Sequence, residues 1–200
     1  MRARKHGPLA AALGDAAILA AGVDVFTRLG FASARVEDIL ASAKIARRTF
    51  YKHFSSKEAV LSAIYDVATR QLMQEIRSAE GDDPLDLVRH GLDLYLDYHV
   101  DNATLLRLLV EHAIRSDSPL HAARRRFREE LVALLDGAVR ARGGPARDPL
   151  LYVALISALE GVSLELLATA AEPGDVARAK RVMHELLATT LGGRRREAKA

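Results

Sequence analysis

Apolar residues recur every three or four positions along most of this chain, and this spacing is the strongest constraint on its fold. In residues 15–29, one face of a 3.6-residue period carries Ile18, Ala21, Val25, Phe26 and Leu29. Only 6 prolines and 13 glycines interrupt the chain, and aromatic residues make up 5% of it. This composition favours helices over a β-sandwich or a β-barrel, so we predict an all-α fold.

Capping and turn residues divide the pattern into separate helices. Ser55 followed by Glu58 is a capping box, which predicts that a long helix begins there. Gly30, Pro84 and the run Gly143–Pro145 mark other boundaries. The expected helices lie at about 15–29, 36–43, 46–52, 55–79, 84–98, 101–115, 120–142, 150–170 and 175–191.

Composition and motifs exclude several classes of protein. The absence of cysteine excludes disulfides, thiolate zinc sites, iron–sulfur clusters and a cysteine nucleophile. The chain has no run of 18 apolar residues and no signal-peptide core, so we expect a cytoplasmic protein without a membrane span. It also lacks a serine-triad signature, a glycine-rich phosphate loop and histidines at metal-ligand spacing. We therefore expect no enzyme activity, no cofactor and no metal.

Charge is unevenly distributed along the chain. Residues 1–57 carry a net charge of +6, and the remaining 143 residues carry −3. A basic head on a mildly acidic body is typical of a polyanion-binding module joined to a second function, although a chance surface excess explains the charge equally well. A second basic run, Arg124–Arg126 with Arg128, precedes Glu129 and Glu130. We interpret it as a solvated helix face with intrahelical charge pairs rather than a second DNA contact.

Residues 36–52 show the spacing of a helix-turn-helix. In this motif the second of two short helices enters the DNA major groove with its N-terminus first. Arg47 and Arg48 stand at the start of that second helix, where a guanidinium can bond guanine O6 and N7. Tyr51, Lys52 and His53 follow, where side chains can reach phosphates. Many helical proteins contain turns of this spacing, so the spacing alone does not establish DNA binding.

A longer pattern surrounds this motif. Residues 49–61 read Thr-Phe-Tyr-Lys-His-Phe-Ser-Ser-Lys-Glu-Ala-Val-Leu, and they are preceded by Ile18–Ala21, Phe26, Leu29–Phe31 and Val36–Ile39. Over about residues 15–62 the chain resembles the DNA-binding domain of TetR-type transcriptional regulators. The resemblance implies an N-terminal three-helix helix-turn-helix domain at 1–60, with a flexible arm at 1–10. It also implies a C-terminal helical ligand-binding and dimerisation domain at 61–200.

The resemblance also implies roles for individual residues. Thr49, Tyr51 and His53 occupy positions that touch the DNA backbone or base edges, and Lys57 is expected to face a phosphate at the start of a helix. The hydrophobic core of the head would hold Phe26, Ile39, Phe50 and Phe54. The full set expected to contact DNA is Arg35, Lys44, Arg47, Arg48, Thr49, Tyr51, Lys52, His53 and Lys57.

The chain departs from the family pattern around the motif. Ala34 and Arg35 replace two threonines, which removes a hydroxyl cap and adds a cation. Lys44 replaces the turn glycine, at a cost of roughly 1 kcal/mol in a left-handed conformation. Ala46 replaces a serine, which removes an N-cap worth about 1 kcal/mol. With Arg48 in place of a common glycine, we expect a less stable but more basic DNA-reading head.

The last two predicted helices, 150–170 and 175–191, suggest a partner. The first is apolar on nearly every face, and such a helix must be covered on more than one side. Two helices from each of two chains would form an intermolecular four-helix bundle. We therefore expect a homodimer, while completion of a monomeric core remains the alternative.

The resemblance implies a small-molecule effector that releases a palindromic double-stranded DNA operator, so that the protein acts as a repressor. Few aromatic residues follow Lys57, which hints at an apolar, acyl-like effector. A helical ligand carrier or enzyme with a vestigial head is the alternative, and a constitutive DNA binder is a third. The candidate polar residues of the effector site are Tyr95, His99, His112, Arg115, Tyr152 and Glu160.

Overall fold

The computed structural model describes residues 17–141, 143, 146–169 and 171–191. The arm predicted at 1–10 lies outside the described residues. Within them the chain is all-α and contains no strand, as the apolar spacing predicts. The helices are α2 (Ala17–Leu29), α3 (Val36–Ala43), α4 (Arg47–His53), α5 (Lys57–Arg77), α6 (Pro84–Asp101), α7 (Ala103–Ala113), α8 (His121–Ala141), α9 (Pro149–Ala168) and α10 (Pro173–Leu191).

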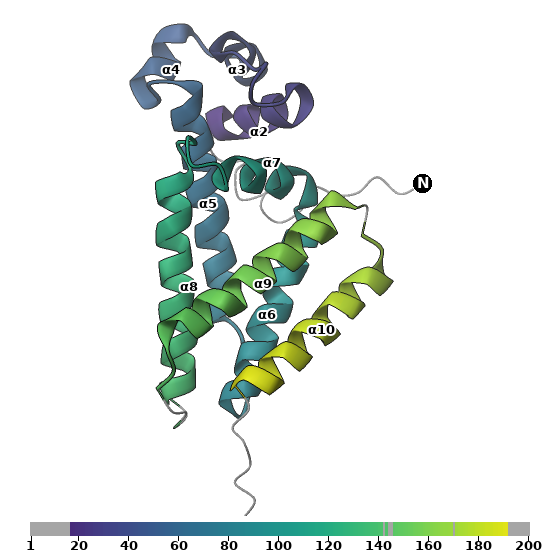
Figure 1. Cartoon of the computed structure of the whole chain (residues 1–200). Helices are drawn as coiled ribbons and strands as arrows, with labels where there is room; N and C mark the ends of the chain where they lie inside the picture. The colour runs from purple at the N-terminus through teal and green to yellow at the C-terminus, as the bar shows by residue number, and fades with distance from the viewer. Residues whose placement is uncertain (1–16, 142, 144–145, 170, 192–200) are drawn as a thin grey trace, which may run out of the picture.

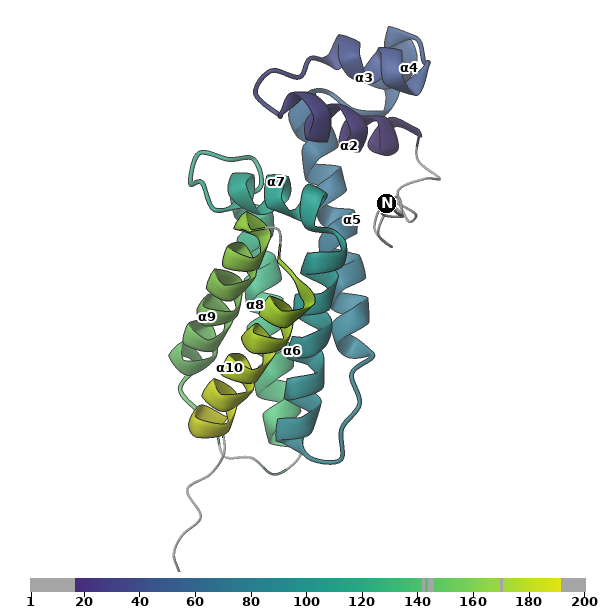
Figure 2. The ribbon, with the colours of Figure 1, turned by 90° about the vertical axis from the view of Figure 1, so that its right-hand side faces the viewer.

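The helices form a small head on a larger bundle. The head consists of α2, α3 and α4, at the end of the molecule farthest from the bundle (Figure 1). The helix α5 begins in the head and runs down into the bundle, where α6 and α8 pack against it, while α9 and α10 run obliquely to it (Figures 1 and 2). The short helix α7 crosses beneath α2 and contacts it. Both α5 and the α2–α7 contact therefore connect the head to the bundle.

The head has its own hydrophobic core. Phe26, Ile39 and Phe50 are fully buried, as expected, and Phe54 is half-buried. The helices α2 and α5 approach closely at Gly22, where an added Cβ would lie 2.7 Å from Val60 Cγ1. A larger residue at this position would push α2 away from α5, because the neighbouring core is packed.

The start of α5 differs by one residue from the prediction. The expected cap Ser55 is wrong, because the N-cap is Ser56, whose hydroxyl accepts a hydrogen bond from the Ala59 N–H at 3.2 Å. Two adjacent serines both suit a cap, and only the backbone path decides between them. The next helix follows the sequence signal, since Asp83 caps α6 and Pro84 occupies its first turn.

The helix α9 is the most apolar part of the bundle. By length and composition alone it is the described helix that could cross a membrane, although its apolar residues do not form an unbroken run. It packs against α6, α7, α8 and α10, and it buries Tyr152, Leu155, Ile156, Leu166 and Leu167. Its contacts place it within the bundle.

Candidate nucleic-acid interface and the cavities behind it

The turn between α3 and α4 has the backbone shape that the motif requires. Lys44 adopts a left-handed conformation with φ 53° and ψ 44°, as expected for the position of the usual glycine. The Ile45 N–H donates to the Leu40 carbonyl at 3.2 Å and closes the turn. The strain of a side chain in this region is therefore present, and it is balanced by the packing of the two helices.

The helix α4 is anchored by one residue and exposed on its other sides. Phe50 is fully buried, and Ala46 provides no side-chain cap, as predicted. The remaining side chains of α4 are exposed at the end of the head: Arg47, Arg48, Thr49, Tyr51, Lys52 and His53. A short helix that presents cationic and hydroxyl groups in this way matches the width and chemistry of a DNA major groove.

Arg47 has intramolecular partners that the sequence did not reveal. Its Nη2 forms an ion pair with Glu37 Oε1 on α3, and its guanidinium lies 5.9 Å from the centre of the Tyr51 ring. Both side chains of the pair are exposed, so the pair contributes little stability and can exchange for another partner. Arg48 and Lys52 form no ion pair within the described part of the chain.

The expectation for Lys57 is not supported by the geometry. Its Nζ donates to the carbonyls of Phe31, Ala32 and Ala34 at 2.8, 3.2 and 2.7 Å. The ammonium also lies 4.7 Å from the centre of the Phe31 ring. An ammonium has three N–H donors, so none is left for a phosphate in this conformation. Lys57 instead holds the loop between α2 and α3 against α5.

Asp38 replaces the cap that Arg35 removes. The Arg35 N–H donates to Asp38 Oδ2 at 2.8 Å, which satisfies one of the free donors at the start of α3. The Arg35 side chain is left exposed. The sequence contained a signal for this hydrogen bond, because Asp38 stands three positions after the residue that lost the hydroxyl cap.

Comparisons with known proteins agree with this interface. Residues 18–64 match the family model described as bacterial regulatory proteins, tetR family. Over these residues the chain is similar to that family. The matched residues include α3, α4 and the beginning of α5, so the family match and the exposed helix coincide.

Individual relatives extend the match. The chain is 31% identical over 78 residues to the HTH-type transcriptional repressor Rv3405c of Mycobacterium tuberculosis, which covers 39% of this chain and 40% of that protein. It is 28% identical over 129 residues to the repressor SCO4008 of Streptomyces coelicolor, covering 62% and 65%. The chain thus spans about two fifths of the length of the first curated relatives it matches.

The whole fold is also found among solved structures. The fatty acid degradation regulator FadR from Bacillus halodurans superposes with a TM-score of 0.72 at 22% identity, and the match covers 96% of this chain and 98% of that one. A TetR-like regulator from Rhodococcus sp. RHA1 has a TM-score of 0.71 at 21% identity, covering 90% and 96%. The helical bundle of this chain therefore has the architecture of these proteins.

An apolar cavity of about 190 Å³ lies in the bundle behind the head. Its walls come from α5, α6, α8, α9 and α10, and nearly all of its lining side chains are aliphatic. They include Ile76, Leu92, Leu135, Leu159 and Met183, and Tyr95 is the aromatic member. A cavity with aliphatic walls suits an apolar molecule.

A second, smaller cavity of about 40 Å³ has a mixed lining, in which polar side chains stand among mainly apolar ones, and we call it the polar cavity. It brings together Tyr95, His99 and Glu160 from the predicted effector residues. It also contains Tyr65 and Arg124, which sequence reasoning did not assign to this site. Because the two residues lie on different helices, only the tertiary structure places them together.

The other three predicted effector residues line neither of these two cavities. His112 packs its ring 4.8 Å from the Phe31 ring, at the junction between α7 and the head. Arg115 is exposed and pairs with Asp117. Tyr152 is buried and lines neither cavity.

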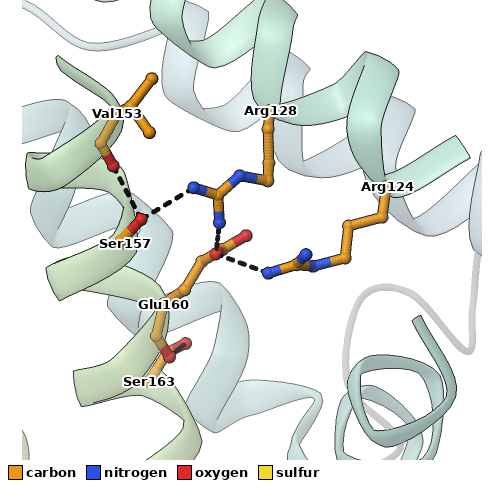
Figure 3. Close-up of polar contacts among 6 residues, drawn as sticks. All are labelled: Arg124, Arg128, Val153, Ser157, Glu160 and Ser163. Atoms are coloured by element: carbon orange, nitrogen blue, oxygen red, sulfur yellow. Dashed lines mark hydrogen bonds and ion pairs between the residues drawn. The ribbon is translucent and has the colours of Figure 1, made fainter. Parts of the chain in front are cut away.

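A charged network connects α8 to α9 beside the polar cavity (Figure 3). Glu160 Oε2 accepts from Arg124 Nη2 at 2.8 Å and also from Arg128 Nη1, and Arg128 Nη2 donates to Ser157 Oγ at 2.8 Å. Burial raises the pKa of Glu160, and the two guanidiniums oppose that rise. The solvated face predicted for this basic run is therefore wrong for Arg124 and Arg128, although Arg125 forms the expected intrahelical pair with Glu129.

Proposed function

We propose that this chain is a cytoplasmic transcriptional repressor that binds a palindromic operator as a homodimer and releases it when an apolar molecule enters the bundle. The exposed face of α4 carries the proposal. Phe50 fixes the helix from the inside, and the outward groups include Arg48 and Lys52, which have no ion-pair partner within the described residues. Unpaired cations on a groove-sized helix favour binding to DNA.

A second copy of the chain is supported by the last two helices. Large apolar side chains stay exposed on α9 and α10: Leu150, Val153, Val182 and Leu186, with Leu150 71% exposed. Such side chains mark a contact surface on a soluble protein. Pairing through α9 and α10 would present two α4 helices to successive major grooves, about 34–36 Å apart.

The effector would act on the head through two connections. The helix α5 is shared by the head and the bundle, and its Ile76 lines the apolar cavity. In addition, Phe31 of the head contacts His112 of α7 and lies under Lys57 of α5. A ligand that moves α5 or α7 would therefore shift the head, with a coupling free energy of about 1–3 kcal/mol.

The relatives support both the sign of regulation and the type of effector. Rv3405c and SCO4008 are described as repressors, and the Bacillus halodurans FadR is described as a regulator of fatty acid degradation. The aliphatic lining of the cavity agrees with an effector of apolar character.

The experiment is a DNA-binding titration on the DNA around the protein's own gene. Arg48→Ala should relax discrimination at one base position and weaken specific binding by about 1–3 kcal/mol. Arg70→Ala removes an exposed arginine from α5 within the bundle and is the matched control, with no expected effect. An absence of binding at micromolar dimer would overturn the proposal and favour a helical ligand carrier. Binding that no apolar molecule relieves would favour a constitutive regulator.

A further inference from the structure

The polar cavity contains a buried hydrogen-bond acceptor without a protein donor. His99 is 4% exposed, and its Nδ1 lies 2.8 Å from the carbonyl oxygen of Tyr95. A carbonyl oxygen only accepts, so Nδ1 carries the proton and Nε2 is the acceptor. Among the described residues, no group donates to Nε2. A buried acceptor of this kind is satisfied when a ligand supplies a donor.

The hydroxyls around the cavity strengthen this requirement. The Thr69 hydroxyl donates to the Tyr65 carbonyl at 3.0 Å, and the Ser163 hydroxyl donates to the Glu160 carbonyl at 2.9 Å. Their protons are therefore used by the backbone. The phenols of Tyr65 and Tyr95 can both donate and accept. A group that donates to His99 Nε2 and accepts from a phenol fits these walls, and a hydroxyl does both.

The need of His99 for a donor selects against a carboxylate head group. The Glu160 carboxylate and the Arg124 guanidinium both line the cavity, and Arg128 also bonds Glu160 (Figure 3), so the charges here do not decide the head group. A ligand carboxylate would offer only acceptors to an imidazole that needs a donor. The head group that fits is therefore neutral.

The sizes of the two cavities set the size of the ligand. A cavity of about 150 Å³ holds benzene, so the 190 Å³ apolar cavity has room for a body of about eight carbons. The 40 Å³ polar cavity has room for a hydroxyl. Tyr95 lines both cavities, and its ring stacks on His99 with centroids 4.1 Å apart. Tyr95 is therefore common to the two linings.

We propose that the two cavities together bind one neutral alcohol of about eight carbons, whose hydroxyl donates a hydrogen bond to His99 Nε2 while its carbon body fills the apolar cavity. The ligand displaces the Tyr95 ring from His99. This inference rests on the proposed effector site and specifies its chemistry. His99 would bind the hydroxyl of the alcohol, and the aliphatic walls would contact its carbon chain.

The test compares isomeric probes on the DNA-free protein by calorimetry. The compounds 1-octanol and 1-methoxyheptane have the same atoms, but only the alcohol has an O–H donor. Wild type should bind the alcohol about tenfold more tightly than the ether, as one additional buried hydrogen bond provides. In His99→Leu the two affinities should become equal. His112→Leu removes a histidine that lines neither cavity and should keep the tenfold preference.

The outcomes separate this inference from the proposed function. The preference is the ratio of the affinities for 1-octanol and 1-methoxyheptane in the same variant. A general loss of stability affects both affinities equally, so it does not change this ratio. Equal binding of alcohol and ether by wild type, no binding of 1-octanol, tighter binding of octanoate, or a preference that survives in His99→Leu would each overturn the inference. DNA binding is measured separately on the operator fragment. A protein that binds DNA but shows no alcohol preference keeps its proposed function and loses only this ligand assignment.

Discussion

Lowering the pH should reduce the free energy of unfolding of this protein because His99 is buried, and the structure provides the size of the effect. The imidazole is buried between Tyr95 and Tyr98, and its burial lowers its pKa from 6.5 to about 4, partly offset by the hydrogen bond to the Tyr95 carbonyl. The unfolded chain therefore takes up a proton at a higher pH than the folded chain. Stability from the neutral imidazole is present above about pH 6.5 and is lost as the pH falls toward 4.

The magnitude follows from the two pKa values. Proton linkage between a pKa of 6.5 and one of about 4 removes about 2 kcal/mol between pH 7 and pH 5, and about 3 kcal/mol by pH 4. His99→Gln keeps a neutral polar group but cannot titrate in this range. The free energy of unfolding of wild type minus that of His99→Gln should therefore fall by these amounts.

The assay is urea unfolding followed by far-UV circular dichroism at a fixed protein concentration, because an oligomer's stability depends on concentration. His112, whose pKa burial and Arg115 also lower, and Glu160, whose pKa burial raises, titrate in both proteins and cancel in the difference. A difference curve that stays flat between about pH 7 and pH 5 would refute the buried, neutral state of His99.

Three further changes test the head and the bundle. Lys57→Ala should lower the unfolding free energy by about 1–3 kcal/mol, because three carbonyls lose a charged donor. The same change should leave the salt dependence of DNA binding unchanged. A salt slope reduced by about one would show that Lys57 does contact a phosphate. Lys44→Gly should raise the melting temperature by relieving a backbone strain of about 1 kcal/mol, whereas Lys44→Ala should not raise it. If both variants raised the melting temperature equally, the cause would be the loss of the lysine charge and not the relief of strain. Val182 on α10 is 52% exposed, and Val182→Asp should convert the proposed dimer to monomers in analytical sedimentation. The control Arg70→Asp on α5 should remain a dimer. A dimer that survives Val182→Asp would show that the chains meet at another surface.

Local signals in the sequence predicted the helices and the reading head. The apolar period located the helices, and Asp83 with Pro84 marked the start of α6. The left-handed turn at Lys44 and the uncapped start of α4 were also predicted. These features depend on contacts within a few residues, so the chain order is enough to reveal them.

The sequence was a weaker guide to individual side chains. It assigned Lys57 to DNA, but the folded loop brings three carbonyls from more than twenty residues away to its ammonium. It described Arg124 and Arg128 as solvated, but Glu160 on α9 lies close enough to bind both. Of the six residues proposed for the effector, the fold brought Tyr95, His99 and Glu160 to the cavities.

The amino-acid order by itself determined which segments are helical, with their ends placed to within a few residues, which face of each is apolar, and which short helix begins with a run of cations. Only the tertiary structure decided which charges neutralise each other, where the cavities lie, and that His99 keeps a lone pair without a protein donor. The physical reason is range. Helix periodicity and capping act over about four residues, whereas ion pairs, cavities and desolvation depend on groups that meet only when distant helices pack.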